Sequence, residues 1–337
     1  MSLSYILSQI YSQLLITPPI PHSPFHSQTI IVTGSNTGLG LEAARHLARL
    51  GASKLILAVR NLDKGLAAKR SIQESSGRGR GRDEKDDDVI EVWPLDLTSY
   101  ESVTQFAARA LRLERLDVLL SNAGLMTKEF KMAEEDELTV TTNVTCTFLL
   151  AMLLLPKLRE TAQRFNVVPR LVVVASDLHF TTELVEERKG ERIFGRLNQR
   201  EGANMGKRYA VTKLMEVFIV RELAARIDQS TKPKVIVNCL TPGYCYSDFS
   251  REATGLDRLI FTVTKFLFAR TTEVGGRTLV AAAAAGEESH GKYMADSQVS
   301  HINPFVHTPE GAETQRRLWE ELVEKLDRVQ PGVMDSI

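Results

Sequence analysis

The segment TIIVTGSNTGLG, residues 29–40, predicts a buried strand that enters a helix through a glycine-rich turn. Apolar β-formers precede the turn, and the residues after it have the apolar spacing of a helix. Glycine lets the backbone approach a bound group, and the free N–H groups and the helix dipole suit a pyrophosphate. The spacing of Gly34, Gly38 and Gly40 is G-x-x-x-G-x-G rather than G-x-G-x-x-G, so a tight turn without a ligand is the alternative.

Strand-like and helical patterns alternate along the rest of the chain. The expected strands cover residues 30–32, 55–59, 89–93, 117–121, 171–175, 235–240 and 291–294. Helical segments between consecutive strands are typical of a parallel sheet with right-handed crossovers. The sequence therefore predicts an α/β fold: a single, doubly wound parallel sheet of about seven strands, with helices on both faces. Ligands of such sheets bind at the carboxyl ends of the strands.

The 337 residues are expected to form one large domain with two extensions. The expected parts are an N-terminal amphipathic helix and proline-rich lead-in (1–27), a nucleotide-binding domain (28–300) and a C-terminal helical extension (301–337). Within the domain, residues 75–88 contain no apolar side chain and are expected to be disordered. Residues 177–205 are expected to be a polar insertion and residues 244–272 a lid, whose apolar part is residues 256–268.

Charge and composition exclude several classes of protein. Lys and Arg number 42, as do Asp and Glu, so nothing indicates a nucleic-acid partner. Three cysteines without C-x-x-C spacing predict neither a disulfide framework nor a metal site, and they fit a reducing, cytoplasmic compartment. No apolar run is long enough to predict a transmembrane helix. Residues 3–16 have helical apolar spacing without basic residues; we expect a helix packed on the domain, with weak membrane-surface contact as the alternative.

The end of the second expected strand indicates which nucleotide the fold would take. NAD-binding folds carry an acidic residue there, which holds the ribose 2′-hydroxyl. Here the strand ends in AVRN, residues 58–61, and Arg60 is suited to a 2′-phosphate. We therefore favour NADP(H), while a solvated loop arginine is the alternative and nearby Asp63 keeps NAD open.

A tyrosine and a lysine form the centre of the expected chemistry. YAVTK places Tyr209 and Lys213 four residues apart on one helix face. A tyrosine phenol has an unperturbed pKa of about 10. A nearby ammonium and a cationic nicotinamide both lower the pKa of the phenol, so Tyr209 is expected to exchange a proton near neutral pH. Ser176, after the fifth strand, is expected to bind a substrate oxygen, and Asn143 to hold a water that links Lys213 to solvent.

Together these motifs resemble the short-chain dehydrogenase/reductase family. The matching segments are TGSNTGLG (33–40), DL (96–97), NAG (122–124), Asn143, Ser176, YAVTK (209–213) and PG (242–243). The resemblance covers residues 28–300 and implies a Rossmann-type domain. It also implies a catalytic tetrad of Asn143, Ser176, Tyr209 and Lys213, in which Lys213 also holds the nicotinamide ribose.

The resemblance extends to the cofactor contacts. The implied cofactor-binding residues are Gly34, Ser35, Asn36, Thr37, Gly38, Leu39, Gly40, Arg60, Asp96, Leu97, Asn122, Ala123, Gly124, Tyr209, Lys213, Pro242, Gly243 and Ser247. Asp96 would meet the adenine. Ser247 would replace the threonine that usually follows the Pro-Gly turn and grips the cofactor amide.

The segments LAVRNLDKG, SDLH and LLLPKL are similar to the retinol-dehydrogenase-like branch of the family. The two ends of the chain are similar to fungal members from secondary-metabolite pathways, which often act on polyketide-like carbonyls or alcohols. Ser176 and Tyr209 are unusually far apart, so residues 177–205 are expected to border the substrate pocket. His179 is interpreted as structural, and Cys239 and Cys245 as inert.

We therefore expect an NADP(H)-dependent oxidoreductase that interconverts a carbonyl and a hydroxyl on a lipophilic small molecule. A catalytically silent NADP-binding sensor or scaffold is the alternative. A monomer and a homodimer are both compatible with the sequence.

Overall fold

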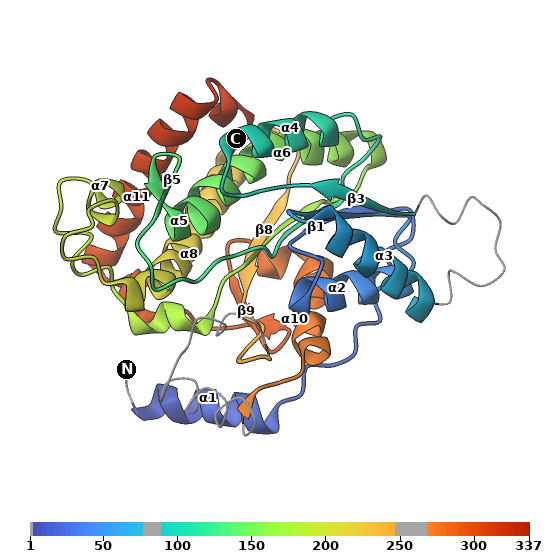
Figure 1. The fold of residues 1–337 in the computed structure, drawn as a ribbon, viewed down its shortest axis with the longest axis horizontal. Coiled ribbons are helices and arrows are strands. Elements are labelled where there is room, and N and C mark those ends of the chain that lie inside the picture. The colour runs from blue at the N-terminus through green and yellow to red at the C-terminus, as the bar shows by residue number, and fades with distance from the viewer. Residues whose placement is uncertain (1–2, 77–88, 247–267) are drawn as a thin grey trace.

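The computed structural model describes residues 3–76, 89–246 and 268–337, and one eight-stranded sheet forms its centre (Figure 1). The strands lie in the order β10-β9-β8-β7-β4-β1-β2-β3. Their bounds are β1 (Thr29–Thr33), β2 (Lys54–Val59), β3 (Ile90–Pro94), β4 (Val118–Ser121), β7 (Arg170–Val174), β8 (Ile236–Leu240), β9 (Tyr293–Ala295) and β10 (Gln298–Val299). All pairings are parallel except that of β10 with β9. The predicted parallel α/β sheet is confirmed; β10, with two exposed residues, is too short to show a pattern.

Helices cover both faces of this sheet (Figure 1). α2 (Gly38–Arg49), α3 (Leu62–Ser76) and α10 (Thr272–Ala284) pack on one face, and α4 (Tyr100–Ala110), α6 (Cys146–Phe165) and α8 (Met205–Gln229) on the other. α11 (Pro309–Val329) packs outside α8, and α1 (Leu3–Leu15) lies below α10 and β9 in Figure 1. The short elements are β5 (Met132–Ala133), β6 (Asp136–Glu137), α5 (Leu138–Val140), the π-turn η2 (Thr141–Thr145), α7 (Ile193–Leu197), and the 3₁₀ turns η3 (Asp177–Thr181), η5 (Glu287–Ser289), η6 (Pro304–His307) and η7 (Val333–Ser336).

The central strand β1 shows why the strands of this sheet are continuous apolar runs in the sequence. All five of its residues are buried. Ile31 belongs to the hydrophobic cluster under α4, α6 and α8, while Ile30 and Val32 belong to the cluster under α2, α3 and α10. Because both faces are covered by helices, every position of the strand is apolar and no alternation appears.

Local contacts define the start of α4, and packing defines the environment of α6. Ser99 caps α4, since its side chain accepts from Ser102 N, while the hydroxyl of the preceding Thr98 donates to Asp96. The helical stretch Leu138–Phe165 is long and apolar enough to cross a membrane, by length and composition alone. Its apolar window is 89% buried inside the protein, so it is a core helix of the fold.

The predicted insertion, residues 177–205, contains η3 and α7 and is tied to the C-terminal extension. Glu321 of α11 accepts hydrogen bonds from Ile193 N and Phe194 N at 2.8 and 3.0 Å. The expected disordered loop falls mostly outside the described residues, apart from Ser75 and Ser76 at the end of α3. Most of the expected lid, including residues 256–267 and Ser247, also lies outside them.

Candidate functional site

The glycine turn after β1 packs closely on the end of β4. Gly34 has a φ of +66°, its N–H donates to Ala58 O at 2.8 Å, and a Cβ there would lie 3.0 Å from Ala123 Cα. A Cβ on Gly40 would collide with the Asn122 amide and lie 2.7 Å from Gly34 O. Gly38 has a φ of +58°, and a Cβ there would meet nothing within 4 Å. Gly34 and Gly40 therefore serve packing within the protein, while the open space at Gly38 suits an approaching ligand.

Asn122 holds the turn from the side of β4. Its Nδ2 donates to Thr33 O at 2.9 Å, and Thr33 Oγ1 accepts from the N–H groups of Asn122 and Ala123 at 3.0 and 2.9 Å. These bonds fix the two loops that follow β1 and β4 against each other. Asn122 therefore shapes the site, and the backbone after it faces the ligand space.

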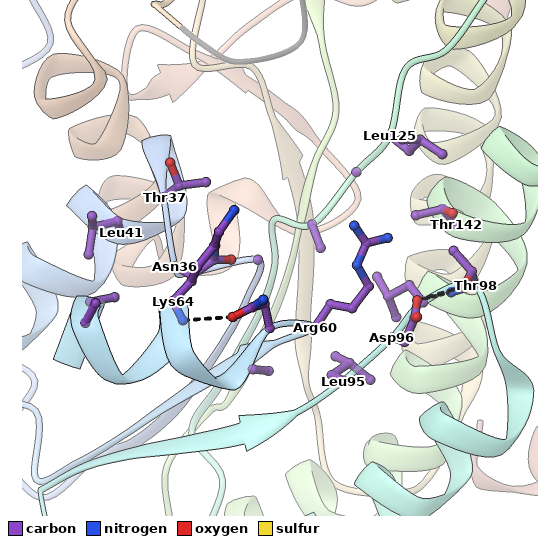
Figure 2. A pocket seen from close by; sticks show the side chains of 18 of the residues that line it. Asn36, Thr37, Leu41, Arg60, Lys64, Leu95, Asp96, Thr98, Leu125 and Thr142 are labelled. Carbon is purple, nitrogen blue, oxygen red and sulfur yellow. Dashed lines mark hydrogen bonds between the residues drawn. The ribbon is translucent and has the colours of Figure 1, made fainter. Parts of the chain in front are cut away.

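A cavity of about 640 Å³ opens at the carboxyl ends of β1, β2, β3 and β4 (Figure 2). Eight predicted cofactor residues line it: Gly34, Asn36, Thr37, Arg60, Asp96, Leu97, Ala123 and Gly124. Of the other predicted cofactor residues, Ser35 is fully buried and donates to Val32 O at 2.9 Å. Asn36, Thr37 and the open Gly38 therefore form a cradle with room for a nucleotide, as the predicted site requires.

The cavity has two cationic side chains at its β2 end. Figure 2 shows Arg60 pointing into the cavity, with Lys64 beside Asn36. Lys64 is missing from the sequence prediction, although it lies four residues after Arg60 in the first turn of α3. Asp63 is exposed and does not line the cavity. The lining therefore favours a phosphate over a ribose hydroxyl held by a carboxylate.

Asp96 is fixed at the opposite side of the cavity. Its Oδ1 accepts from Thr98 N and Thr98 Oγ1 at 2.9 and 2.8 Å, and its backbone N–H donates to Ser102 Oγ at 2.9 Å. The carboxylate is thus held in place before any ligand arrives, which suits a hydrogen bond to the adenine.

Tyr209, Lys213 and Ser176 meet beyond Gly124. Helix α8 places Lys213 Nζ 5.4 Å from the centroid of the Tyr209 ring, and the Tyr209 hydroxyl is hydrogen-bonded to Ser176. Lys213 Nζ donates to Val174 O at 2.7 Å and to Glu216 Oε1 at 2.8 Å. The structure therefore brings together three of the four predicted catalytic side chains.

Asn143 contributes to this cluster through the backbone of a neighbouring loop. Its Oδ1 accepts from Leu125 N at 2.7 Å, and its Nδ2 donates to Leu125 O and Thr212 Oγ1 at 2.9 and 3.0 Å. A Cβ on Gly124 would lie 3.4 Å from Asn143 Oδ1 and 3.7 Å from Lys213 Nζ. The Asn143 amide thus joins the loop after β4 to α8, and the water expected between Asn143 and Lys213 stays a prediction.

The pKa values of the cluster differ from the expectation for Tyr209. Desolvation raises the pKa of the Tyr209 phenol, and the Lys213 ammonium only partly opposes this increase. Burial also raises the pKa of the Glu216 carboxyl to about 7. Burial acts against the charge of Lys213, but the effects of Glu216 and Tyr209 together outweigh it, and the pKa of Lys213 is raised. Glu216 is absent from the sequence prediction, although it lies one helical turn after Lys213.

The Pro242–Gly243 turn after β8 is linked to the serine side of the site. Gly243 N donates to Thr241 Oγ1 at 3.1 Å, and Thr241 Oγ1 donates to Asp177 Oδ2 at 3.0 Å. Asp177 directly follows Ser176, so the turn lies beside the catalytic cluster.

His179 and the cysteines are structural, as predicted. His179 is fully buried, its Nδ1 contacts Ser176 O at 2.7 Å, and Asn303 N donates to its Nε2 at 3.2 Å. Burial lowers the pKa of His179 to about 4, so the imidazole is neutral at physiological pH. Cys239 and Cys245 are buried free thiols whose pKa values burial raises, to about 12 for Cys245. These thiols therefore stay protonated and unreactive.

Comparisons with known proteins find similar sequences over nearly the whole chain. The short chain dehydrogenase family model matches residues 28–179. The short chain dehydrogenase/reductase dmxR8 of Cryptosporiopsis sp. is 44% identical and covers 97% of this chain and 99% of its own. The short-chain dehydrogenase anuD of Penicillium roqueforti is also 44% identical, over 97% of this chain and 84% of its own.

Solved structures show the same fold. An uncharacterized protein from Mycobacterium paratuberculosis is 26% identical with a TM-score of 0.64, covering 91% of this chain and 95% of its own. A short chain dehydrogenase from Escherichia coli CFT073, complexed with NADPH, is 25% identical with a TM-score of 0.53, covering 82% of this chain and 99% of its own.

Proposed function

Because this chain belongs to the short-chain dehydrogenase/reductase family, we propose that it is an NADP(H)-dependent oxidoreductase that interconverts a carbonyl and a hydroxyl on a lipophilic small molecule. One arrangement carries the proposal. The Tyr209 hydroxyl is bonded to Ser176 beside the Lys213 ammonium, and Gly124 links this cluster to a cavity with two cationic side chains at its far end.

The side chains divide the cofactor site into three parts. The turn at Asn36, Thr37 and Gly38 would hold the pyrophosphate, for which its backbone N–H groups and the start of α2 are suited. Arg60 and Lys64 would bind the 2′-phosphate by charge-assisted hydrogen bonds. NADP(H), when bound, supplies or accepts the hydride of the reaction.

The chain itself carries out the proton transfer. Ser176 would orient the substrate oxygen through a hydrogen bond and polarise it. Tyr209 would give its phenolic proton to that oxygen during reduction and take a proton from it during oxidation. Lys213 lowers the pKa of Tyr209 against the effect of desolvation, which makes this transfer easier near neutral pH.

Titration of the purified protein with NADPH and NADH, followed by fluorescence, tests the nucleotide assignment. We expect tight NADPH and weak NADH binding, followed by turnover in a screen of lipophilic ketones, aldehydes and alcohols. The opposite nucleotide preference would contradict the roles of Arg60 and Lys64. NADPH binding without turnover on any of these substrates would favour the sensor or scaffold.

The substrate class and the setting are parts of the same proposal. The relatives in Cryptosporiopsis and Penicillium favour a fungal secondary-metabolite pathway with a polyketide-like substrate. Comparison of metabolite extracts before and after deletion of the gene tests this placement, since a substrate with an unchanged carbonyl or hydroxyl should accumulate.

We further propose a cytoplasmic monomer or homodimer in which α1 packs on the domain, with weak peripheral contact to a membrane surface as the alternative. Four apolar side chains of α1 are exposed: Ile10, Tyr11, Leu14 and Leu15. Because α1 has no basic residue, the contact would be apolar and would not depend on salt. Sedimentation with neutral phosphatidylcholine vesicles tests the contact, and size-exclusion chromatography with light scattering tests the oligomeric state.

A further inference from the structure

Gln13, in the N-terminal helix α1, binds the main chain at two places more than 200 residues away. Its Nε2 donates to Tyr244 O at 2.7 Å and to Phe268 O at 2.8 Å, and its Oε1 accepts from Tyr244 N at 3.0 Å. By pairing with both the N–H and the C=O of Tyr244, the amide acts as a neighbouring strand would. One side chain thus joins the segment after β8 to the segment before α10.

A second residue fixes the end of α1 to the same place. Arg270 is 8% exposed, and its Nη2 donates to Ser12 O at 2.8 Å and to Ile16 O at 2.9 Å. It also forms an ion pair with Asp296 at 2.7 Å, and the Ser12 hydroxyl donates to that carboxylate. A guanidinium at the C-terminal end of a helix satisfies free carbonyls and opposes the helix dipole. Helix α1 is therefore anchored by specific polar contacts and does not merely rest on the domain.

These contacts reach the turn that is predicted to meet the cofactor. Gly243 has a φ of +76°, and a Cβ there would lie 2.9 Å from both Gln13 Oε1 and Arg270 Nη1. Gly243 N donates to Thr241 Oγ1, which in turn donates to Asp177, the neighbour of Ser176. Hydrogen bonds, together with the peptide links from Tyr244 to Gly243 and from Asp177 to Ser176, therefore connect α1 to the serine side of the catalytic cluster.

We infer that α1 belongs to the cofactor site as a positioning element, and that the Gln13 amide sets the place of the Pro242–Gly243–Tyr244 turn against the nucleotide. This inference rests on the proposed function, because the turn matters only if a nicotinamide nucleotide binds beside it. It differs from a membrane role for α1, since Gln13 faces the domain while the apolar residues face solvent.

The substitution Gln13→Ala tests the inference in the full-length protein. We expect the Kd for NADPH to rise about fivefold to tenfold, because three hydrogen bonds that hold the turn are lost. The KM for NADPH should rise with it, while kcat changes by less than about twofold, since the tyrosine and lysine are untouched. Gln13→Glu should weaken binding further, because a carboxylate oxygen would then face the carbonyls of Tyr244 and Phe268.

Leu15→Ala, at a position of α1 that is 72% exposed, serves as the matched control. It should leave the Kd for NADPH unchanged and, if α1 touches membranes, reduce sedimentation with vesicles. Equal nucleotide affinity of wild type, Gln13→Ala and Gln13→Glu would overturn the inference.

Amide hydrogen exchange provides a readout that needs no nucleotide. The N–H of Tyr244 is protected by Gln13 Oε1, so a peptide covering residues 240–246 should exchange faster in Gln13→Ala than in wild type or Leu15→Ala. If the wild type binds neither NADPH nor NADH, the proposed function fails. The exchange rate alone then tests whether Gln13 holds the turn. Unchanged exchange would show that Gln13 does not hold the turn.

Discussion

Glu216 Oε1 accepts a hydrogen bond from Lys213 Nζ over 2.8 Å, one turn along α8, and both side chains are buried. Among the described residues, no group bonds the second carboxylate oxygen, Oε2. Because burial raises the pKa of Glu216 to about 7, the carboxylate gains or loses its proton near neutral pH. The charge beside Lys213, and thus the field at Tyr209, therefore changes with pH.

Glu216→Gln is expected to change how stability depends on pH. The pKa of Glu216 is about 7 in the folded chain and 4.5 as its ordinary value, so the folded chain binds more protons between these pH values. For this group, the free energy of unfolding of the wild type falls as pH rises from 4.5 to 7. The free energy of unfolding of Glu216→Gln, taken relative to that of the wild type, should therefore rise by about 1 to 3 kcal/mol as the pH increases from about 4.5 to about 7.5.

Urea unfolding at several pH values measures this difference. Glu320→Gln, at an exposed position of α11, is the matched control and should follow the wild type. If the curves of wild type and Glu216→Gln run parallel across this range, then Glu216 does not titrate there.

Tyr209→Phe is expected to abolish turnover while keeping nucleotide binding. The phenyl ring preserves the packing of α8, but the group that transfers the proton is lost. Positioned acid–base groups contribute about 10²- to 10⁴-fold to rate, so kcat should fall at least about 100-fold. The Kd for NADPH, from fluorescence titration, should stay within about twofold. Tyr11→Phe, at an exposed position of α1, should behave as wild type; near-normal turnover of Tyr209→Phe would remove Tyr209 from the mechanism.

Arg60→Ala and Lys64→Ala are expected to weaken NADPH binding and leave NADH binding nearly unchanged. Hydrogen bonds to charged groups are worth about 1.5–3 kcal/mol, so each substitution should raise the Kd for NADPH about tenfold to a hundredfold. Arg112→Ala removes an exposed cation outside the cavity lining and controls for net charge. Titrations of all three variants with both nucleotides measure these Kd values. Equal losses of affinity for NADPH and NADH would rule out a contact to the 2′-phosphate.

The sheet and the candidate catalytic side chains could be predicted from the sequence because local patterns determine them. The apolar run at residues 30–32, the glycine turn and the YAVTK spacing each depend on neighbours within one strand or one helical turn. The same reasoning finds Arg60, since its place at a strand end decides which edge of the sheet it reaches. The same rules could also have predicted Lys64 and Glu216, because each lies about one helical turn from a predicted site residue.

Other features depend on contacts between distant segments and have no local pattern. Gln13 is one of several polar residues in a weakly amphipathic helix, and only the fold brings it to Tyr244 and Phe268. The desolvation that raises the pKa of Tyr209 likewise comes from packing of distant segments, whereas the YAVTK spacing indicates only the opposing ammonium of Lys213.

Gly40→Ala is expected to disturb the nucleotide cradle through its contact with Asn122. The new methyl group would collide with the Asn122 amide and lie 2.7 Å from Gly34 O, so the loops after β1 and β4 must separate. Overpacking of this kind costs about 1–3 kcal/mol, and the cavity for the nucleotide should change shape with it. Gly195→Ala, in α7, is the matched control, since its Cβ would meet Arg192 Cβ at an ordinary 3.4 Å. We expect lower stability in urea and weaker NADPH binding for Gly40→Ala only; wild-type values in both assays would show that the turn can relax around the added methyl group without loss of the site.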